Sequence, residues 1–387
     1  MAGAYHRRMG RTLLITNDFP PRTGGIQNFV HALAVRQPAD SLVVYASSWR
    51  GAAEFDAEQP FPVVRADTTV LLPTPRARRA AVALAREYDC DTAWYGAMAP
   101  LGLLAPALRG AGVTRQVAQT HGHEAGWAAL PGPRGLLRRI GQHVDVVTYL
   151  AEYFRVRLDR AINARRPGAR LEHLAPGVDT EKFRPDLVHG EGAGIRRELG
   201  LADRPVIVCV SRLVPRKGQD TLIRALPEVR RRVPDAALLI VSGGPDKQRL
   251  QRLAADTGVA DHVVFTGSVP WTALPHYYAA GDVFAMPCRT RRGGLEAEGL
   301  GIVYLEASAT GLPVVAGDSG GAPDAVREGE TGFVVSGTDL PALSDRLVTL
   351  LSDRSLAARM GKAGRAWVES DWQWDTIAAR MTGLLRG

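Results

Sequence analysis

Short apolar runs alternate with stretches of helical periodicity along the whole chain. The runs are nearly continuous and are bounded by turn residues, which predicts strands covered by helices on both faces. A first series lies at residues 11–19, 42–47, 92–97, 115–121, 144–151 and 171–175. A second series lies at residues 205–213, 236–244, 262–269, 283–288, 313–319 and 332–337. Strands that alternate with helices form parallel sheets, so we expect an α/β fold with two doubly wound domains that face a cleft.

The predicted domain limits follow from the stretch between the two series. Residues 176–194 are rich in Gly, Pro and charge, which is typical of a linker. We therefore expect an N-terminal domain at 1–178 and a C-terminal domain at 179–370. Three tryptophans, at 367, 372 and 374, indicate a packed contact, so we expect residues 371–387 to form a helix that packs back on the first domain.

Composition indicates a folded protein that works inside the cell. Of the 387 residues, 45% are hydrophobic and 23% are charged, as in globular proteins with a full core. The longest uncharged stretch, 92–108, is broken by Gly and Pro and is too short to span a membrane. No signal peptide is visible in residues 1–10, so we expect a cytoplasmic protein. Three widely spaced cysteines predict neither disulfides nor a zinc site, only buried thiols.

Positive charge is concentrated in the first half of the chain. The net charge is +8, and residues 1–190 carry 24 basic and 17 acidic side chains. Arginines recur at helical spacing in residues 76–86, 134–139 and 155–170. Such stretches form either solvated helix faces or a surface for anionic membranes, and both interpretations stay open. The stretches lack the interleaved aromatic residues of nucleic-acid binding proteins, which argues against a nucleic-acid partner.

Two motifs of the first domain follow predicted strands. In NDFPPRTGGIQNF, Gly24 and Gly25 precede a predicted helix, whose free N–H groups can bind an anion. An ordinary strand-to-helix turn is an equal alternative. In THGHE, His121 and His123 with Glu124 would suggest a metal if further ligands were near, and none are. His121 therefore suits hydrogen bonding or acid–base chemistry, with a structural role as the alternative.

Two further motifs lie in the second domain. SRLVPRKG places Arg212, Arg216 and Lys217 beyond a strand, which predicts a diphosphate site from Arg212 and Lys217, with Arg216 facing solvent. A solvated basic loop is the alternative. In EAEGLGIVYLEASATG, glycines open a helix between Glu298 and Glu306, and Glu306 should lie about two turns into it. Burying Glu306 without a partner would be costly, which favours a binding role over a solvated helix face.

Together, GGIQNFV, HGHE, PGVDTEKFRP, SRLVPRKG and the helix with two glutamates resemble the retaining glycosyltransferases of family four. The resemblance covers essentially the whole chain and implies two Rossmann-like domains, the GT-B fold. Within the family, DFPPRTGGIQNF and residues 286–326 are similar to actinobacterial enzymes that add a second mannose, α-1,6-linked, to phosphatidylinositol monomannoside from GDP-mannose. The sequence departs from commoner members at Ala175 and Pro176 and in the Arg-rich insertion at 289–294.

The resemblance also implies a role for each candidate residue. Catalysis would involve His121, Arg212, Lys217 and Glu298. Arg212 and Lys217 would hold the diphosphate and Glu306 the ribose, with Gly25 near the phosphate and Val269 under the guanine. The sugar hydroxyls would meet His121, Glu298 and the amides of Gly299, Leu300, Gly301 and Ile302. Asp18 and Gln27 would face the acceptor.

The implied reaction is a front-face transfer by a hexosyltransferase. The leaving diphosphate would help to remove the acceptor proton, and no metal or other cofactor is expected because Arg212 and Lys217 supply the positive charge. The partners would be a nucleotide-sugar donor, a glycolipid acceptor and the anionic inner face of the plasma membrane. Two alternatives stay open: transfer from a UDP-linked sugar to a soluble small molecule, and a nucleotide-sugar binding protein without catalysis.

Overall fold

The computed structural model describes residues 10–164 and 167–387. The chain divides into two compact units: one takes in the described residues up to Pro176 together with Trp374–Gly387, and the other is Gly177–Gln373. The first unit thus ends two residues before the expected limit at 178, and its last segment begins three residues after 371. Residues 1–9, and Arg165 and Arg166 of the predicted basic stretch, lie outside the described residues.

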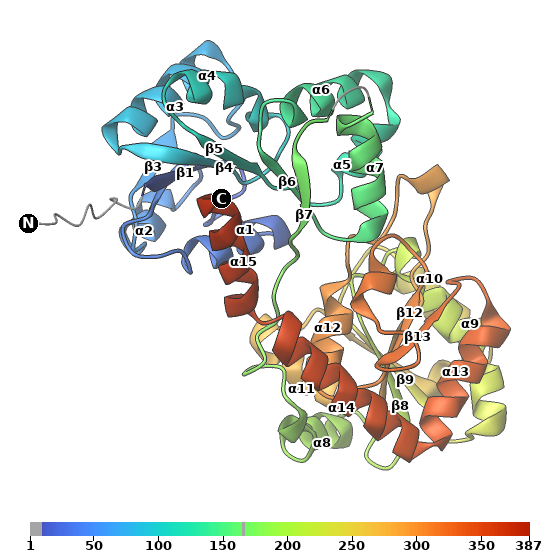
Figure 1. The fold of residues 1–387 in the computed structure, drawn as a ribbon. Helices are drawn as coiled ribbons and strands as arrows, with labels where there is room; N and C mark the ends of the chain where they lie inside the picture. Colours follow the sequence, from blue (N-terminus) through green and yellow to red (C-terminus); the bar gives the residue numbers. More distant parts are fainter. Residues whose placement is uncertain (1–9, 165–166) are drawn as a thin grey trace, which may run out of the picture. The chain divides into compact units, whose positions relative to one another are not determined.

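The first unit is built on a seven-stranded sheet with the strand order β3-β2-β1-β4-β5-β6-β7 (Figure 1). Every pairing in this sheet is parallel. The strands are β1 (Arg11–Thr16), β2 (Leu42–Ser47), β3 (Val63–Ala66), β4 (Cys90–Tyr95), β5 (Arg115–Ala118), β6 (Val146–Tyr149) and β7 (Arg170–His173).

Helices cover both faces of this sheet. They are α1 (Gly25–Ala34), α2 (Ala52–Ala57), α3 (Pro75–Glu87), α4 (Ala105–Gly110), α5 (Glu124–Ala129), α6 (Pro131–Gly141), α7 (Glu152–Ile162) and α15 (Trp374–Arg386). The start of α3 shows why a helix forms there: Thr74 caps it by accepting a hydrogen bond from the Ala77 N–H at 3.2 Å, and Pro75 occupies its first position.

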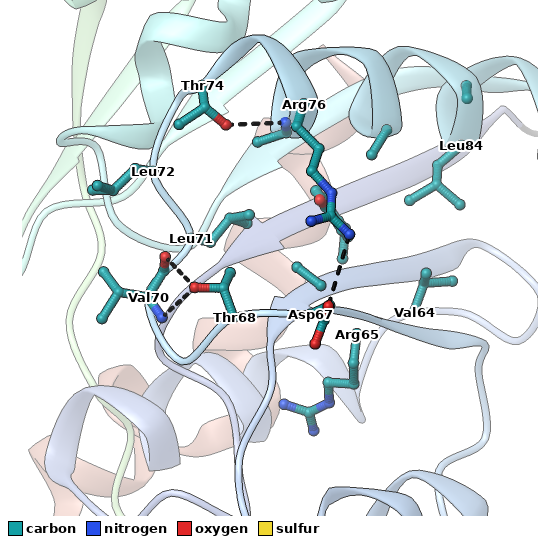
Figure 2. A pocket seen from close by; sticks show the side chains of 15 residues that line it. Val64, Arg65, Asp67, Thr68, Val70, Leu71, Leu72, Thr74, Arg76 and Leu84 are labelled. Atoms are coloured by element: carbon teal, nitrogen blue, oxygen red, sulfur yellow. Dashed lines mark hydrogen bonds and ion pairs between the residues drawn. The ribbon is translucent and has the colours of Figure 1, made fainter.

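Strand β3 is a correction to the sequence prediction, which found six strands in this half. Its four residues, VVRA, are all partly exposed, and β3 lies at the edge of the sheet. An edge strand lacks the continuous apolar run of a buried strand, so its sequence carries little signal. Figure 2 shows β3 and α3 with the loop between them.

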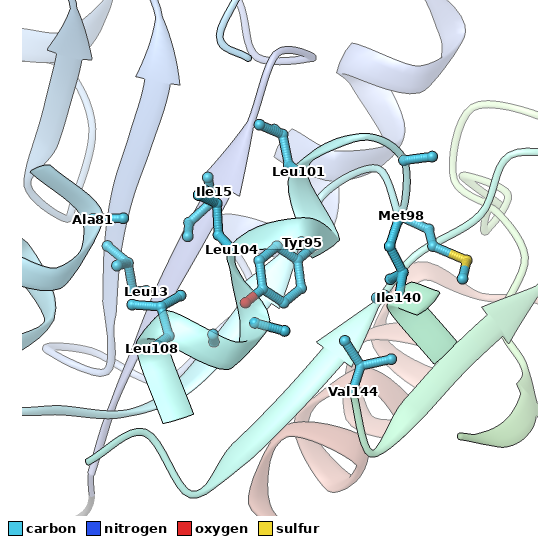
Figure 3. Close-up of a cluster of buried hydrophobic side chains, with 14 of the residues drawn as sticks. Leu13, Ile15, Ala81, Tyr95, Met98, Leu101, Leu104, Leu108, Ile140 and Val144 are labelled. Carbon is cyan, nitrogen blue, oxygen red and sulfur yellow. The ribbon is translucent and has the colours of Figure 1, made fainter. Parts of the chain in front are cut away.

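The core of the first unit lies between the sheet and the helices α3, α4, α6 and α7. Leu13, Ile15 and Tyr95 of the sheet pack there against Leu104 and Leu108, and each of the five is at most 2% exposed (Figure 3). Tyr95 still finds a polar partner, because its hydroxyl donates to Gln116 Oε1 at 2.6 Å. Alternate residues of β1, such as Leu13 and Ile15, thus pack into the core on this face of the sheet.

The second unit repeats this architecture with a six-stranded parallel sheet in the order β10-β9-β8-β11-β12-β13. All six strands predicted in this half are present: β8 (Val206–Val210), β9 (Ala237–Val241), β10 (Val263–Gly267), β11 (Val283–Met286), β12 (Val314–Gly317) and β13 (Gly332–Val335). The helices are α8 (Glu191–Glu198), α9 (Gln219–Arg232), α10 (Lys247–Asp256), α11 (Leu274–Ala279), α12 (Ile302–Ala309), α13 (Leu340–Ser352) and α14 (Arg354–Asp371). The predicted fold class of two doubly wound parallel-sheet domains is confirmed.

Most of the segment predicted as a linker is instead built into the second unit. Phe183 is 1% exposed and packs edge-on against Tyr278, with ring centroids 5.5 Å apart. The Arg365 guanidinium donates to the carbonyl oxygens of Thr180 and Phe183 at 3.0 and 2.6 Å. The chain passes from one unit to the other between Pro176 and Gly177, inside the predicted linker, but the rest of the segment packs on the second unit because a few buried side chains hold it.

The end of the chain belongs to both units. Trp367 and Trp372 are buried in the second unit with ring centroids 5.6 Å apart, whereas Trp374 begins α15 in the first unit. Trp374 lies 6.1 Å from the Phe29 ring of α1, and Met381 of α15 is fully buried. The last helix is therefore part of the core of the first unit.

The three cysteines are free and buried, as expected. Burial raises the pKa of Cys209 to about 12, so this thiol stays protonated. None of the helices in residues 10–164 and 167–387 is long and apolar enough to cross a bilayer.

Candidate active site

Both sheets reverse their strand order beside their first strand, and doubly wound sheets bind ligands at the carboxyl ends of the strands at such points. In the first unit, Asp18 lies two residues beyond β1, and its carboxylate accepts a hydrogen bond from the Gln27 side chain at 2.6 Å. Gln27 is 6% exposed on α1, and the Asp18 N–H donates to Thr16 Oγ1 at 2.8 Å. The two residues predicted to face the acceptor therefore form one hydrogen-bonded pair.

The amino end of α1 presents the predicted Gly pair. The helix begins at Gly25, with no side-chain cap and no acidic residue in its first turn. A Cβ atom added to Gly25 would meet no other atom of the described chain within 4 Å. The first N–H groups of α1 have no side-chain cap, and anion binding there stays a prediction beside the ordinary strand-to-helix turn.

His121 lies beyond the end of β5 and is held as a neutral imidazole. Its Nε2 lies 2.6 Å from the carbonyl oxygen of Gly96, and because a carbonyl only accepts, Nε2 carries the proton. Burial lowers the pKa of His121, although the nearby Glu124 carboxylate opposes the shift. The Nδ1 atom is then an acceptor, suited to a hydroxyl group. Phe29 of α1 supports the ring edge-on, 6.0 Å away.

The neighbouring Glu124 is a buried carboxylate that orders the HGHE turn. It is 1% exposed, and its Oε2 accepts from the His121 N–H at 3.0 Å. Its Oε1 lies 3.4 Å from Nε2 of the exposed His123. In the part of the chain that the structure describes, no three His, Cys, Asp or Glu side chains are grouped for a metal ion.

In the second unit, the loop after β8 carries the predicted diphosphate ligands. Lys217 Nζ lies 2.7 Å from Glu298 Oε2, and both side chains are about nine-tenths buried. Arg212 is exposed, and among the described residues nothing bonds its guanidinium. Arg216 differs from the prediction: it is partly buried, with Nε 3.9 Å from the same Glu298 oxygen. One carboxylate thus gathers two cations, while Arg212 remains available to a ligand.

Gln219 fixes the shape of this loop. It is the first residue of α9, is 1% exposed, and donates to Ser211 Oγ at 2.8 Å and to the Arg212 carbonyl at 3.2 Å. These bonds tie the start of the helix to the end of β8. Arg212 and Lys217 are therefore held on a rigid turn.

The segment after Glu298 confirms a glycine-opened helix but corrects its start. α12 begins at Ile302, so Glu306 lies just over one turn into the helix rather than two. Gly301 precedes it with φ 76°, and a Cβ there would lie 2.5 Å from the Tyr304 ring. Residues 299–301 are therefore irregular and precede the helix; we call them the lead-in to α12. Their backbone N–H groups lie outside the helix, and the first helical N–H is that of Ile302.

Glu306 has a dedicated donor that the sequence did not reveal. The hydroxyl of the fully buried Tyr278 donates to Glu306 Oε2 at 2.6 Å. Desolvation raises the pKa of Glu306 to about 7, partly offset by this hydrogen bond. Burial holds the pKa of Tyr278 well above its usual value, so its hydroxyl remains a donor. One carboxylate oxygen is thereby fixed, and the other can serve a diol.

Each unit thus brings together one group of the predicted residues. The first holds Asp18, Gly25, Gln27 and His121, and the second holds Arg212, Lys217, Glu298, Glu306 and the lead-in to α12. Val269, which follows β10, is partly buried in the second unit. The individual roles of these residues stay predictions.

Two doubly wound parallel-sheet units, each with polar and cationic groups at the ends of its strands, define the class of glycosyltransferases with the GT-B fold. The model named Glycosyltransferase Family 4 matches residues 23–182, and the model named Glycosyl transferases group 1 matches residues 194–367. The chain belongs to the glycosyltransferase family that these two models describe, and it is an enzyme of the hexosyltransferase class.

Two relatives that match over nearly the full length of the chain are both described as mannosyltransferases. A GDP-mannose-dependent alpha-(1-6)-phosphatidylinositol monomannoside mannosyltransferase of Mycolicibacterium smegmatis is 56% identical over 97% of this chain and 98% of its own length. The protein with the same description from Mycobacterium tuberculosis is 52% identical over 98% of this chain and 99% of its own. Among solved structures, HepE of Anabaena in complex with UDP has a TM-score of 0.77 at 21% identity, covering 97% of this chain and 99% of its own. At that identity the likeness concerns the fold.

Proposed function

We propose that the protein moves mannose from GDP-mannose to a phosphatidylinositol mannoside, adding the second mannose in α-1,6 linkage. The full-length mycobacterial relatives carry this activity in their names. The observation that carries the proposal is the group of Arg212, Lys217, Glu298 and Glu306 around β8 and α12, because it has the charges and acceptors that a nucleotide sugar requires.

The donor would be bound by the second unit. A guanidinium binds phosphate through two parallel hydrogen bonds and an ammonium as a compact charge, so Arg212 and Lys217 suit the two phosphates. Glu306, with one oxygen fixed by Tyr278, suits the ribose diol. Glu298 and the amides of the α12 lead-in would hold the mannose hydroxyls, and Val269 would pack under the guanine.

The chemistry we propose is a front-face transfer with retention. The bond from the anomeric carbon to the diphosphate breaks while the acceptor oxygen bonds on the same face, and the acceptor proton passes to the leaving phosphate. Asp18, Glu298 and Glu306 each already have a hydrogen-bond or ion-pair partner, which supports a mechanism without a carboxylate nucleophile. His121, with its free Nδ1, would accept from a sugar hydroxyl near the reacting carbon.

Charge on the leaving diphosphate would be stabilised by the protein's own cations. Preorganised donors at a developing charge are typically worth about 3 to 4 kcal/mol each. Gln219 fixes the backbone at Arg212, and Glu298 holds the Lys217 ammonium in place. We therefore propose that transfer requires no metal ion or other cofactor.

The acceptor would be presented at a membrane. The exposed side of α3 carries Arg76, Arg78, Arg79 and Arg86, and its first turn holds no acidic residue. Exposed arginines on one helix attract anionic lipid headgroups, each by about 1 kcal/mol near the surface. We propose that the first unit binds the inner face of the plasma membrane peripherally, from the cytoplasm, and takes its acceptor there.

A ligand panel tests the donor assignment. Thermal unfolding is followed with GDP, UDP, ADP and GDP-mannose, with and without EDTA. A ligand at a hundredfold excess over Kd stabilises the native state by about 2.7 kcal/mol. A higher unfolding midpoint with GDP and GDP-mannose alone, unchanged by EDTA, supports the proposal. A shift with UDP would move the assignment to a UDP-linked donor, and no shift with any nucleotide would refute the donor site.

A further inference from the structure

A pocket in the first unit lies beside the exposed arginines of α3, and the functions proposed so far do not use its interior. It has a volume of about 680 Å³, is partly open to solvent, and is lined by residues of β3, the loop after it and α3 (Figure 2). Its wall is mainly aliphatic, formed by Val64, Ala66, Leu71, Ala77, Ala80 and Leu84. Polar and charged side chains, among them Arg65, Asp67 and Thr74, line the rest of the pocket. Pockets of about 300 to 1,000 Å³ hold small ligands, and the aliphatic part of this wall suits an apolar group.

The rim of the pocket carries two exposed aliphatic side chains. Val70 is 55% and Leu72 50% exposed, and both belong to the loop that lines the pocket. Thr68 Oγ1 donates to the Val70 carbonyl and accepts from the Val70 N–H at 3.0 and 3.3 Å, so the loop has a fixed shape. Two large apolar side chains held in water beside an apolar pocket indicate a surface that is covered when the protein works.

The same rim is basic. Arg76 lines the pocket, and Arg78 and Arg79 are exposed on the same turn of α3. Arg76 lies 3.8 Å from Asp67, but both side chains are at least 80% exposed, so water screens this pair. An apolar pocket with a cationic rim matches a molecule that joins an aliphatic chain to a phosphate.

The pocket is tied to the pair that faces the acceptor. Asn17 Nδ2 donates to the Leu71 carbonyl at 2.8 Å, and the Leu71 N–H donates to Asn17 Oδ1 at 2.6 Å. Asn17 directly precedes Asp18 in the chain. Asn17 therefore connects Leu71 of the pocket wall to the Asp18–Gln27 pair. A headgroup at Asp18 would have its lipid chain next to this pocket.

We propose that the pocket holds one acyl chain of the glycolipid acceptor, with Val70 and Leu72 in the apolar layer of the membrane and Arg76 at the lipid phosphate. The inference rests on the proposed function in that the acceptor is a phospholipid. Beyond the proposed function, the inference adds a binding site for one acyl chain outside the bilayer. Binding of the chain there would position the headgroup at Asp18.

Affinity for short-chain lipids tests the pocket without catalysis. The probes are dihexanoyl and dioctanoyl phosphatidylinositol, titrated calorimetrically below their micelle concentrations. Each buried methylene strengthens binding about fourfold, so two more methylenes on one held chain predict about fifteenfold tighter binding of the dioctanoyl lipid. A ratio near one would overturn the proposal, and a ratio of about 200 would mean that both chains are held and would overturn its one-chain form.

A pocket-filling variant and a matched control locate the chain. Ala83 lines the pocket and is exposed, so Ala83→Trp can fill the pocket from α3 without entering the core. We expect this variant to bind both lipids equally. Ala53→Trp places the same side chain on the exposed face of α2 and should keep the wild-type ratio. If Ala83→Trp, with an unchanged unfolding midpoint, also kept that ratio, the chain would lie elsewhere.

The outcomes separate this inference from the proposed function. A protein that transfers mannose to phosphatidylinositol monomannoside but shows no chain-length ratio refutes the acyl site alone. A protein that shows the ratio, loses it in Ala83→Trp and transfers no mannose refutes the proposed function and leaves the acyl site standing.

Discussion

At the scale of single residues, the chemistry depends on charges that the fold partly neutralises. Lys217 and Glu298 form a buried ion pair at 2.7 Å, and Arg216 lies 3.9 Å from the same Glu298 oxygen, so removing Glu298 would leave the buried Lys217 ammonium without its partner. Arg212 has no such counterpart among the described residues and is ready for a ligand. The candidate site therefore combines one buried ion pair with one exposed guanidinium that has no partner among the described residues.

Replacing Lys217 tests the leaving-group role. We expect Lys217→Ala to lower kcat by about 10² or more at saturating donor, because the charge that develops on the diphosphate loses a preorganised donor. Lys182→Ala is the matched control, since Lys182 forms an exposed ion pair with Asp179. Initial rates and unfolding midpoints are measured together. A change in KM alone, with kcat unchanged, would contradict the role.

Glu306 predicts a pH-dependent stability. Its folded pKa of about 7 exceeds its ordinary value of 4.5, so the native state binds the proton more tightly than the unfolded state does. Stability is therefore lost as pH rises from 4.5 through 7. The neutral isostere in Glu306→Gln removes this loss, so the variant should gain in unfolding midpoint over the wild type at pH 8 and lose that gain at pH 5.

The same substitution probes the nucleotide. A charged acceptor holds a hydroxyl more strongly than an amide oxygen does, so Glu306→Gln should bind GDP about tenfold more weakly at pH 8. Isothermal titration measures this change. Equal affinity in variant and wild type would place the ribose elsewhere.

A substitution at Gly25 is expected to lower the transfer rate without lowering stability. A methyl group there meets nothing within 4 Å, and Ala favours a helix more than Gly does, so Gly25→Ala should not lower the unfolding midpoint. If the amides of this helix end approach the donor phosphate, transfer should fall at least tenfold. Unchanged transfer rates in the stable variant would remove Gly25 from the site.

At the scale of elements, strands with buried faces could be predicted and contacts between distant residues could not. Strand β8, VIVCV, is entirely buried and its apolar run shows it, whereas the edge strand β3 has no buried position. The sequence also placed His121 and Arg212 correctly beyond strand ends. Tyr278 and Glu306 are 28 positions apart, and their bond exists only because α11 and α12 meet in the fold.

Substitutions in α15 test whether this helix is part of the core of the first unit. Met381 of α15 is fully buried, so Met381→Ala should cost about 2 to 5 kcal/mol of unfolding free energy. Gly383 is exposed on the same helix with free space around it, and Gly383→Ala should stabilise by up to about 1 kcal/mol. Chemical denaturation measures both. Equal stability of Met381→Ala and wild type would mean that α15 is not part of the core.

At the scale of the whole molecule, the two units share one fold and differ in charge. The strand orders are equivalent, but the basic excess belongs to residues 1–190, which carry 24 basic and 17 acidic side chains. This asymmetry was visible in the sequence, and the structure adds that the α3 arginines are exposed. The proposed donor site lies in the second unit, and the proposed lipid contact lies in the first.

Direct transfer tests the central claim. The purified protein is incubated with GDP-mannose and vesicles that contain phosphatidylinositol monomannoside, in EDTA, and the lipid product is analysed by mass spectrometry and NMR. We expect one added mannose in α-1,6 linkage. No mannolipid product, or a product formed from UDP-linked sugar instead, would contradict it.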